Sequence, residues 1–280
     1  MRWHKTKDDA RVEAFILSQL QHTQDWIGSL IHRGIASDFI PSFKKTNRIT
    51  EDDLTKHIID LSKQQFEFSK QKLYRSQTKS SSGDSFCALY FHEYDISNDE
   101  SSLLSEADTQ IKNAIHNLYL QEELIHIFEE SNWLNSEVIL TWNFSDYATV
   151  FGQIDVVGFM KDRKPVVVDW KTGDLSSVTR NQMALYLKLV LNKWEKFNAD
   201  DVTVLEVNLK HGKIIRHFFD DSDMSKVDDF VYASINDIKA IAQNQRYEEQ
   251  KKRLGYYSFA NSPNSCLYCK FRKLCEDLLE

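Results

Sequence analysis

Hydrophobic positions in the first part of the chain recur every three or four residues, which is the spacing of amphipathic helices. The pattern predicts one helix over residues 8–34 and a second over 51–75. A stretch rich in Ser and Gly, residues 76–86, then interrupts the helical spacing. We therefore expect two domains, an N-terminal helical lobe of residues 1–80 and a second domain of residues 81–280.

The pattern changes to runs of β-branched residues in the middle of the chain. A helix predicted over 105–130 is followed by a strand at 137–144 and by two apolar runs at 149–159 and 165–171. The short charged segment Lys161-Asp-Arg-Lys164 separates the two runs, so we expect them to form an antiparallel hairpin.

Helical and strand patterns alternate in the remainder of the chain. A helix that contains Gln182 extends to about Glu195, two strands follow at 201–209 and 213–219, and a long helix is predicted over 225–253. This order of elements predicts an α/β fold with a mixed central sheet flanked by helices.

Acidic residues converge in the predicted hairpin. Folding about its turn brings Asp155 opposite the region of Asp169, and Asp169 and Lys171 project together because side chains alternate along a strand. Two carboxylates in an apolar sheet repel each other unless a cation compensates them, and oxygen ligands suit Mg²⁺ or Mn²⁺. A lysine beside a metal-bound water suits phosphodiester hydrolysis. Gln182 and Tyr186 lie one helical turn apart on the next helix and face the same way.

Charge and composition narrow the class of protein. The chain has 280 residues and a net charge of −7, so any contact with nucleic acid must be local, at basic patches such as 70–79, 161–164 or 251–253. We find no signal peptide and no apolar run long enough to span a bilayer, and we expect a soluble, cytoplasmic protein without a membrane partner.

Four cysteines form a separate candidate site. Cys266, Cys269 and Cys275 lie within the last fifteen residues, and Cys87 lies far upstream. Nothing indicates secretion, so ligands of a metal or cluster are expected rather than disulfides. One close pair, one wider spacing and one distant cysteine favour a [4Fe–4S] cluster, with Zn²⁺ as the alternative.

Together these motifs resemble the RecB-like branch of the PD-(D/E)xK nuclease superfamily. The likeness is greatest to its iron–sulfur members, the CRISPR-associated Cas-four exonuclease and the nuclease domain of AddB. It covers about residues 76–280 and depends on Cys87 with Tyr90 and Phe91, His116, Gly152 with Asp155, Asp169 with Lys171, Gln182 with Tyr186, and Cys266, Cys269 and Cys275.

The resemblance implies a PD-(D/E)xK core with a cluster-binding C-terminal segment, residues 254–280. Asp155, Asp169, His116 and the main-chain carbonyl of Trp170 are then expected to bind the catalytic metal, although the helix around His116 lacks the glycine that usually precedes this histidine. Lys171 is implied as the catalytic lysine. Gln182 and Tyr186 are implied to orient the substrate, and Glu137 is expected just outside the metal ligands.

The function implied is that of a metal-dependent DNA nuclease. We expect an exonuclease that acts on single-stranded DNA or DNA ends, in CRISPR or other antiviral defence or in recombination and repair, with the cluster as a structural staple. The alternative is a non-catalytic DNA-binding or adaptor subunit of a larger complex.

Overall fold

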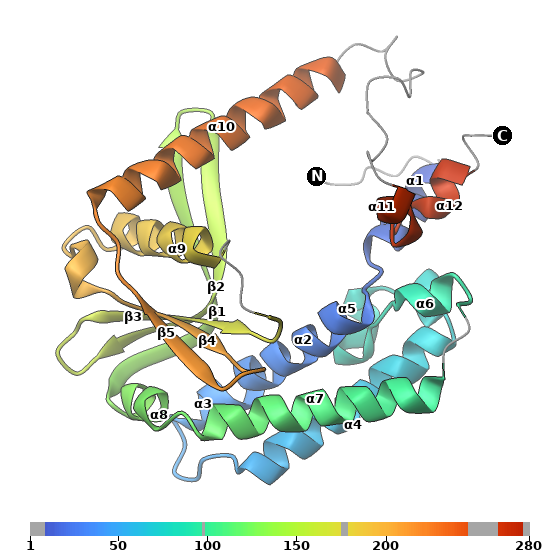
Figure 1. Ribbon diagram of the computed structural model, residues 1–280, viewed down its shortest axis with the longest axis horizontal. Helices are drawn as coiled ribbons and strands as arrows, with labels where there is room; N and C mark the ends of the chain where they lie inside the picture. Colours follow the sequence, from blue (N-terminus) through green and yellow to red (C-terminus); the bar gives the residue numbers. More distant parts are fainter. Residues whose placement is uncertain (1–8, 97–98, 175–178, 246–262, 277–280) are drawn as a thin grey trace. The chain divides into compact units, whose positions relative to one another are not determined.

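The computed structural model describes residues 9–96, 99–174, 179–245 and 263–276 (Figure 1). The chain divides into two compact units. The sheet unit consists of Ile27–Ile59 and Ser105–Gln243, and the terminal unit of Met1–Trp26, Asp60–Leu104 and Asn244–Glu280. Each unit combines separate segments of the chain, so this division does not test a single boundary, and the boundary near residue 80 stays a prediction.

The sheet unit contains a five-stranded mixed sheet, as the sequence predicts. Its strands follow the order β1-β2-β3-β4-β5, and only the β3–β4 pair among them is parallel. The crossover between these two parallel strands includes helix α9, as such a connection requires. The strands are β1 (Ser131–Ser145), β2 (Ala148–Met160), β3 (Pro165–Lys171), β4 (Thr203–Asn208) and β5 (Lys213–His217).

Helix α9 (Thr179–Lys193) packs on the sheet and fixes the position of the residues it carries. Its side chains Met183, Leu187 and Val190 share one buried cluster with Val167 and Val204 of the sheet. Each fully buried side chain of this size contributes about 1.5–3 kcal/mol of hydrophobic stabilisation. Helix α10 (Asp221–Gln245) lies against α9 through a second, smaller cluster (Figure 1).

The helices that precede the sheet are shorter than their hydrophobic patterns indicate. The expected helix over 8–34 is divided into two because Gln21 leaves the helical path and pairs with the backbone around Leu89. The expected helix over 105–130 is likewise divided near Gln121. The observed elements are α1 (Asp9–Ser18), α2 (Thr23–Gly34), η1 (Ile35–Phe39), α3 (Ile40–Ser42), α4 (Glu51–Lys70), α7 (Glu100–Tyr119) and α8 (Glu122–Glu129).

The terminal unit is built around short elements and a buried aromatic cluster. Tyr74, Phe86 and Tyr90 pack there with Leu17 of α1 and with Leu20, two residues after its end. The remaining short elements of the chain are η2 (Leu73–Arg75), α5 (Lys79–Ser82), η3 (Gly83–Ser85), α6 (Tyr90–Glu93), η4 (Ala199–Asp201, in the sheet unit), α11 (Pro263–Leu267) and α12 (Arg272–Glu276).

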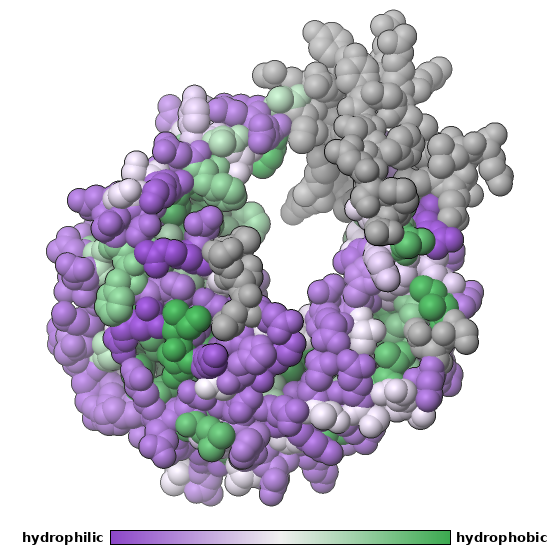
Figure 2. All heavy atoms as spheres, viewed as in Figure 1, coloured by the Kyte–Doolittle hydropathy of each residue, from purple (hydrophilic) through white to green (hydrophobic). Residues whose placement is uncertain are grey.

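The surface agrees with the high share of charged residues in the sequence. Figure 2 shows that hydrophilic side chains cover most of the visible face. Among the described residues, none of the helices combines the length and the hydropathy needed to cross a bilayer.

Candidate active site

The β2–β3 hairpin brings two acidic residues together. Val156 pairs with Val168, and continuing this register by one residue places Asp155 opposite Asp169. The backbone N–H of Trp170 donates to Asp155 Oδ2 at 2.8 Å, while the indole of Trp170 is buried. The backbone of β3 therefore holds the Asp155 carboxylate in place.

Lys171 is held by a chain of polar contacts from both sides. Its Nζ lies 2.7 Å from Asp169 Oδ2 and donates to Gln182 Oε1 at 2.7 Å. Gln182 Nε2 donates to the Tyr186 hydroxyl at 2.9 Å, and that hydroxyl donates to the Gln153 carbonyl at 3.1 Å. The structure thus brings Lys171, Gln182 and Tyr186 into one connected array beside Asp169.

Asp169 lies in an environment that disfavours its negative charge. Only 3% of the residue is exposed, and burial, followed by the neighbouring charge of Asp155, raises its pKa to about 6 despite the nearby Lys171 ammonium. The Lys171 ammonium, 2.7 Å from Asp169 Oδ2, offsets only part of this cost, because the pKa stays raised. A buried carboxylate whose charge is only partly compensated is the type of group that a divalent cation stabilises.

Glu137 of β1 adds a third carboxylate. Burial and the charge of Asp155 raise the pKa of Glu137, and the side chain of Gln153 donates a hydrogen bond to it. The backbone of Glu137 is left-handed, with φ of 54°, which is costly for a non-glycine residue within a strand. A residue with a strained backbone therefore carries the third carboxylate of the site.

A histidine from α2 also contacts the acidic residues. His32 Nδ1 lies 3.5 Å from Asp155 Oδ1. Burial lowers the pKa of His32, but the hydrogen bond to Asp155 and the charges of Asp155, Asp169 and Glu137 outweigh it and leave the pKa raised. His32 therefore supplies an imidazole at the position where the sequence analysis expected His116.

Gly28 is the signal in the sequence that could have indicated His32. It lies one helical turn before His32, and a Cβ atom on it would be 2.7 Å from Thr172 Oγ1, just after β3. A larger residue at this position would collide with the Thr172 side chain, so glycine lets α2 approach the end of β3.

His116 has different surroundings. Its side chain is 59% exposed, and its Nδ1 lies 3.0 Å from Glu51 Oε1 of α4. The structure does not join it to Asp155 or Asp169 by any hydrogen bond or ion pair of the described residues, so its role as a metal ligand stays a prediction.

The cysteines lie in the terminal unit. Cys87 is buried, which raises the pKa of its thiol to about 12, whereas Cys266 is exposed and Cys269 half-buried. The Tyr90 hydroxyl donates to the Leu267 carbonyl at 2.7 Å, so the C-terminal segment lies against α6, directly after Cys87. The side chain of Cys275 lies outside the described residues.

Neither the acidic residues of the hairpin nor the cysteines form a complete metal-binding site in the described residues. In the part of the chain that the structure describes, no group of three or more His, Cys, Asp or Glu side chains is spaced to hold a metal ion as it stands. The donor types and the buried, only partly compensated Asp169 carboxylate at the hairpin nevertheless fit a hard divalent cation.

Comparisons with known proteins identify the family. No curated protein matches the chain. Among the solved structures that resemble it are a provisionally named exonuclease from Eubacterium rectale and SSO0001. The first has 10% identity over 93% of this chain and 97% of that chain, with a TM-score of 0.38. The second has 15% identity over 66% of this chain and 78% of that chain, with a TM-score of 0.28. The family model of the PD-(D/E)XK nuclease superfamily matches residues 2–276. The chain therefore belongs to the PD-(D/E)XK nuclease superfamily.

Proposed function

We propose that this protein is a metal-dependent deoxyribonuclease with its catalytic centre at Asp155, Asp169 and Lys171. The observation that carries the proposal is the buried Asp169 carboxylate opposite Asp155, with its Oδ2 2.7 Å from the Lys171 ammonium. Two opposed carboxylates and a lysine are the groups that a hydrolytic phosphodiester site needs.

The metal ligands we propose are Asp155, Asp169, the Trp170 carbonyl and His32, with His32 in place of His116. A bound Mg²⁺ or Mn²⁺ supplies a Lewis acid that acidifies water and neutralises phosphate charge. His32 must lose a proton to become a ligand, so metal affinity should fall as the imidazole is protonated.

The other residues of the site position the reacting groups. Lys171 orients the attacking water and places positive charge beside the phosphate. Gln182 and Tyr186 restrict the Lys171 ammonium to one direction through the two hydrogen bonds that connect them. Glu137 lies beside Asp155 and is available as a further proton acceptor.

For the substrate and cofactors, we propose action on single-stranded DNA or DNA ends and a [4Fe–4S] cluster held by Cys87, Cys266, Cys269 and Cys275, with Zn²⁺ as the alternative. The contact of the C-terminal segment with α6 supports a shared cysteine site. A cytoplasmic role in antiviral defence, recombination or repair is part of the same proposal.

Anaerobic purification followed by an assay on labelled DNA tests these proposals together. We expect a brown, iron-containing protein that degrades DNA with Mn²⁺ or Mg²⁺ and is silent in EDTA. Cleavage that persists in EDTA contradicts the metal-dependent mechanism. Tight DNA binding without cleavage under any divalent metal would favour the adaptor alternative. A colourless protein that contains one zinc ion would show that the cysteines bind Zn²⁺ and not an iron–sulfur cluster.

His32→Ala and His116→Ala form a matched pair of variants. Removing a metal ligand should raise the Mn²⁺ concentration needed for half-maximal activity by about tenfold or more, so we expect this for His32→Ala only. His116→Ala removes an exposed side chain and should behave as wild type. Mn²⁺ titrations of activity, with Mn²⁺ binding by calorimetry beside them, measure the difference. A large effect in His116→Ala and none in His32→Ala would reverse the assignment.

A further inference from the structure

Phe151 and Ile139 are the two most exposed of the large apolar side chains on the β1–β2 hairpin. Phe151 of β2 is 74% exposed and Ile139 of β1 is 65% exposed. Exposed apolar side chains that adjoin one another are candidates for a binding contact.

The two side chains share one face of the hairpin. Residues alternate between covered and exposed along both strands, so Leu140 and Ile154 are buried in the core while Ile139 and Phe151 point outward. Thr141 pairs with Phe151, and Ile139 pairs with Gln153. Ile139 and Phe151 are therefore diagonal neighbours, about 7–8 Å apart between their Cα atoms.

This apolar pair continues the candidate active site. Gln153 lies next to the pair on the same face, and its side chain donates to Glu137. Phe151 is four residues from Asp155 along β2, which corresponds to about 13 Å. A strand of nucleic acid bound at Asp155 and Asp169 is long enough to reach Phe151.

We propose that Phe151 and Ile139 form a stacking platform for an unpaired base of single-stranded DNA bound at the active site. This inference rests on the proposed nuclease function and names what would make the site prefer single strands. In a duplex, neighbouring bases cover both faces of each base, so only an unpaired base offers a face to an exposed ring.

The surroundings of the pair favour a base over other occupants. The neighbouring outward positions are the polar residues Thr141, Asn143, Thr149 and Gln153. Two apolar side chains within a polar rim are too small an area for a stable protein interface, which buries about 800 Å² on each partner. The nearby carboxylates Glu137 and Asp155 repel phosphates, so base stacking is the attraction that this face can supply.

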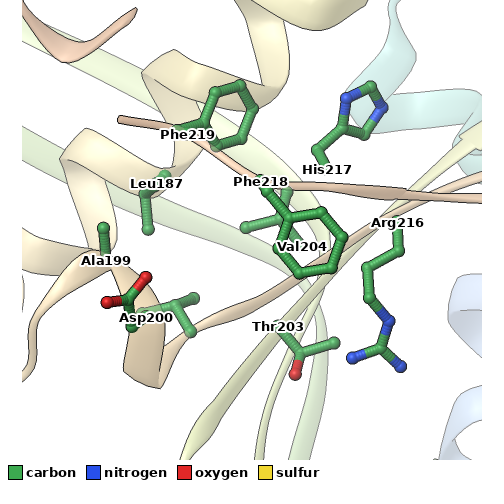
Figure 3. Close-up of a pocket in the computed structure, with 10 residues that line it drawn as sticks. Leu187, Ala199, Asp200, Thr203, Val204, Arg216, His217, Phe218 and Phe219 are labelled. Atoms are coloured by element: carbon green, nitrogen blue, oxygen red, sulfur yellow. The ribbon is translucent and has the colours of Figure 1, made fainter. Parts of the chain in front are cut away.

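Phe218 provides a matched control for Phe151. It is 75% exposed and follows β5, at the opposite edge of the sheet. Figure 3 shows its ring with Thr203 and Arg216 at a separate pocket. Phe218→Ala therefore removes an equally exposed ring without touching the hairpin.

Binding of a short fluorescent single strand in EDTA, and the KM for its cleavage with Mn²⁺, test the platform. We expect Phe151→Ala to weaken single-strand binding by about 5- to 100-fold and to raise KM with little change in kcat, while Phe151→Tyr restores both. Phe218→Ala, and blunt-duplex binding by every variant, should match wild type. Thermal unfolding should be unchanged because the ring is exposed.

An oligonucleotide with a single abasic site, moved along the strand, identifies the stacked base. At one position the abasic site should weaken wild-type binding as much as Phe151→Ala does, and the two changes should not add. Equal affinities of Phe151→Ala and Phe218→Ala for the single strand overturn the platform. So does a loss of self-association, instead of DNA binding, in Phe151→Ala. If the wild type cleaves no DNA, the nuclease proposal fails, but the binding measurements still decide the platform.

Discussion

Replacing Asp169 by asparagine should abolish metal-dependent cleavage and, at the same time, stabilise the metal-free protein above pH 6. The first effect should be at least about a hundredfold, because the amide lacks the charge that we propose binds the metal and that balances Lys171. The second follows from the pKa of Asp169, which burial and Asp155 raise to about 6.

The sign of the pH effect follows from proton binding. The unfolded carboxyl has a pKa of about 3.9, so between roughly pH 4 and 6 the folded state keeps a proton that the unfolded state loses. The stability that Asp169 contributes is therefore fully present below pH 4 and is lost as pH rises through 6. The shift corresponds to on the order of 3 kcal/mol well above pH 6, and the lost pairing with Lys171 offsets part of the gain in Asp169→Asn.

Denaturant unfolding in EDTA at about pH 5 and pH 8 measures this effect. Asp169→Asn should be more stable than wild type at the higher pH, and its unfolding midpoint should no longer rise when Mn²⁺ is added. Asp146→Asn, at the exposed turn between β1 and β2, is the matched control and should change neither quantity. Equal stability of Asp169→Asn and wild type at pH 8 would contradict the claim that the buried charge of Asp169 destabilises the metal-free protein.

Replacing Glu93 by glutamine should release the C-terminal cysteine segment from the terminal unit. Glu93 is 1% exposed and accepts hydrogen bonds from the Tyr74 hydroxyl at 2.8 Å, from Arg75 Nε at 3.0 Å and from Lys273 Nζ at 2.6 Å. Burial raises its pKa, but the hydrogen bonds from Arg75, Lys273 and Tyr74 outweigh it and lower the pKa to about 2. Breaking a buried ion pair costs about 3–5 kcal/mol.

The stability that Glu93 contributes is present above its unfolded pKa and is lost as pH falls through about 2. Glu93→Gln should therefore destabilise at neutral pH and converge with wild type in acid. Faster proteolysis between Gly255 and Pro263 and a lower iron content should accompany it. Glu100→Gln, which removes an exposed ion pair with Lys70, should leave stability almost unchanged. An unchanged proteolysis rate in Glu93→Gln would show that the cysteines alone hold the segment.

The hairpin and its acidic residues could be predicted because their signals are local. The short turn between two β-branched runs sets the register, and the register places Asp155 opposite Asp169 without further information. Gln182 follows the strand by only eleven residues and lies on a helix with a clear boundary, so its hydrogen bond to Lys171 is also within reach of sequence reasoning.

His32 could not be assigned in the same way, and Glu137 was expected near the metal ligands only through the family resemblance. His32 reaches Asp155 from a helix more than a hundred residues earlier, and its position depends on tertiary packing at Gly28. The left-handed backbone at Glu137 interrupts a strand pattern that gives no sign of it. His116 was expected from its place in the order of motifs, a criterion that contains no information on which helix packs over the site.

Gln153 connects the hairpin to the lysine in a way that has a mechanical consequence. Its carbonyl accepts from Tyr186, its side chain donates to Glu137, and Phe151 lies two residues away on the same strand. A displacement of β2 at Gln153 would therefore move Tyr186, Gln182 and, through them, the Lys171 ammonium. If bound DNA bends the hairpin, the Lys171 ammonium would therefore move relative to the reacting phosphate. The rate of cleavage would then depend on how the DNA strand is positioned on the hairpin.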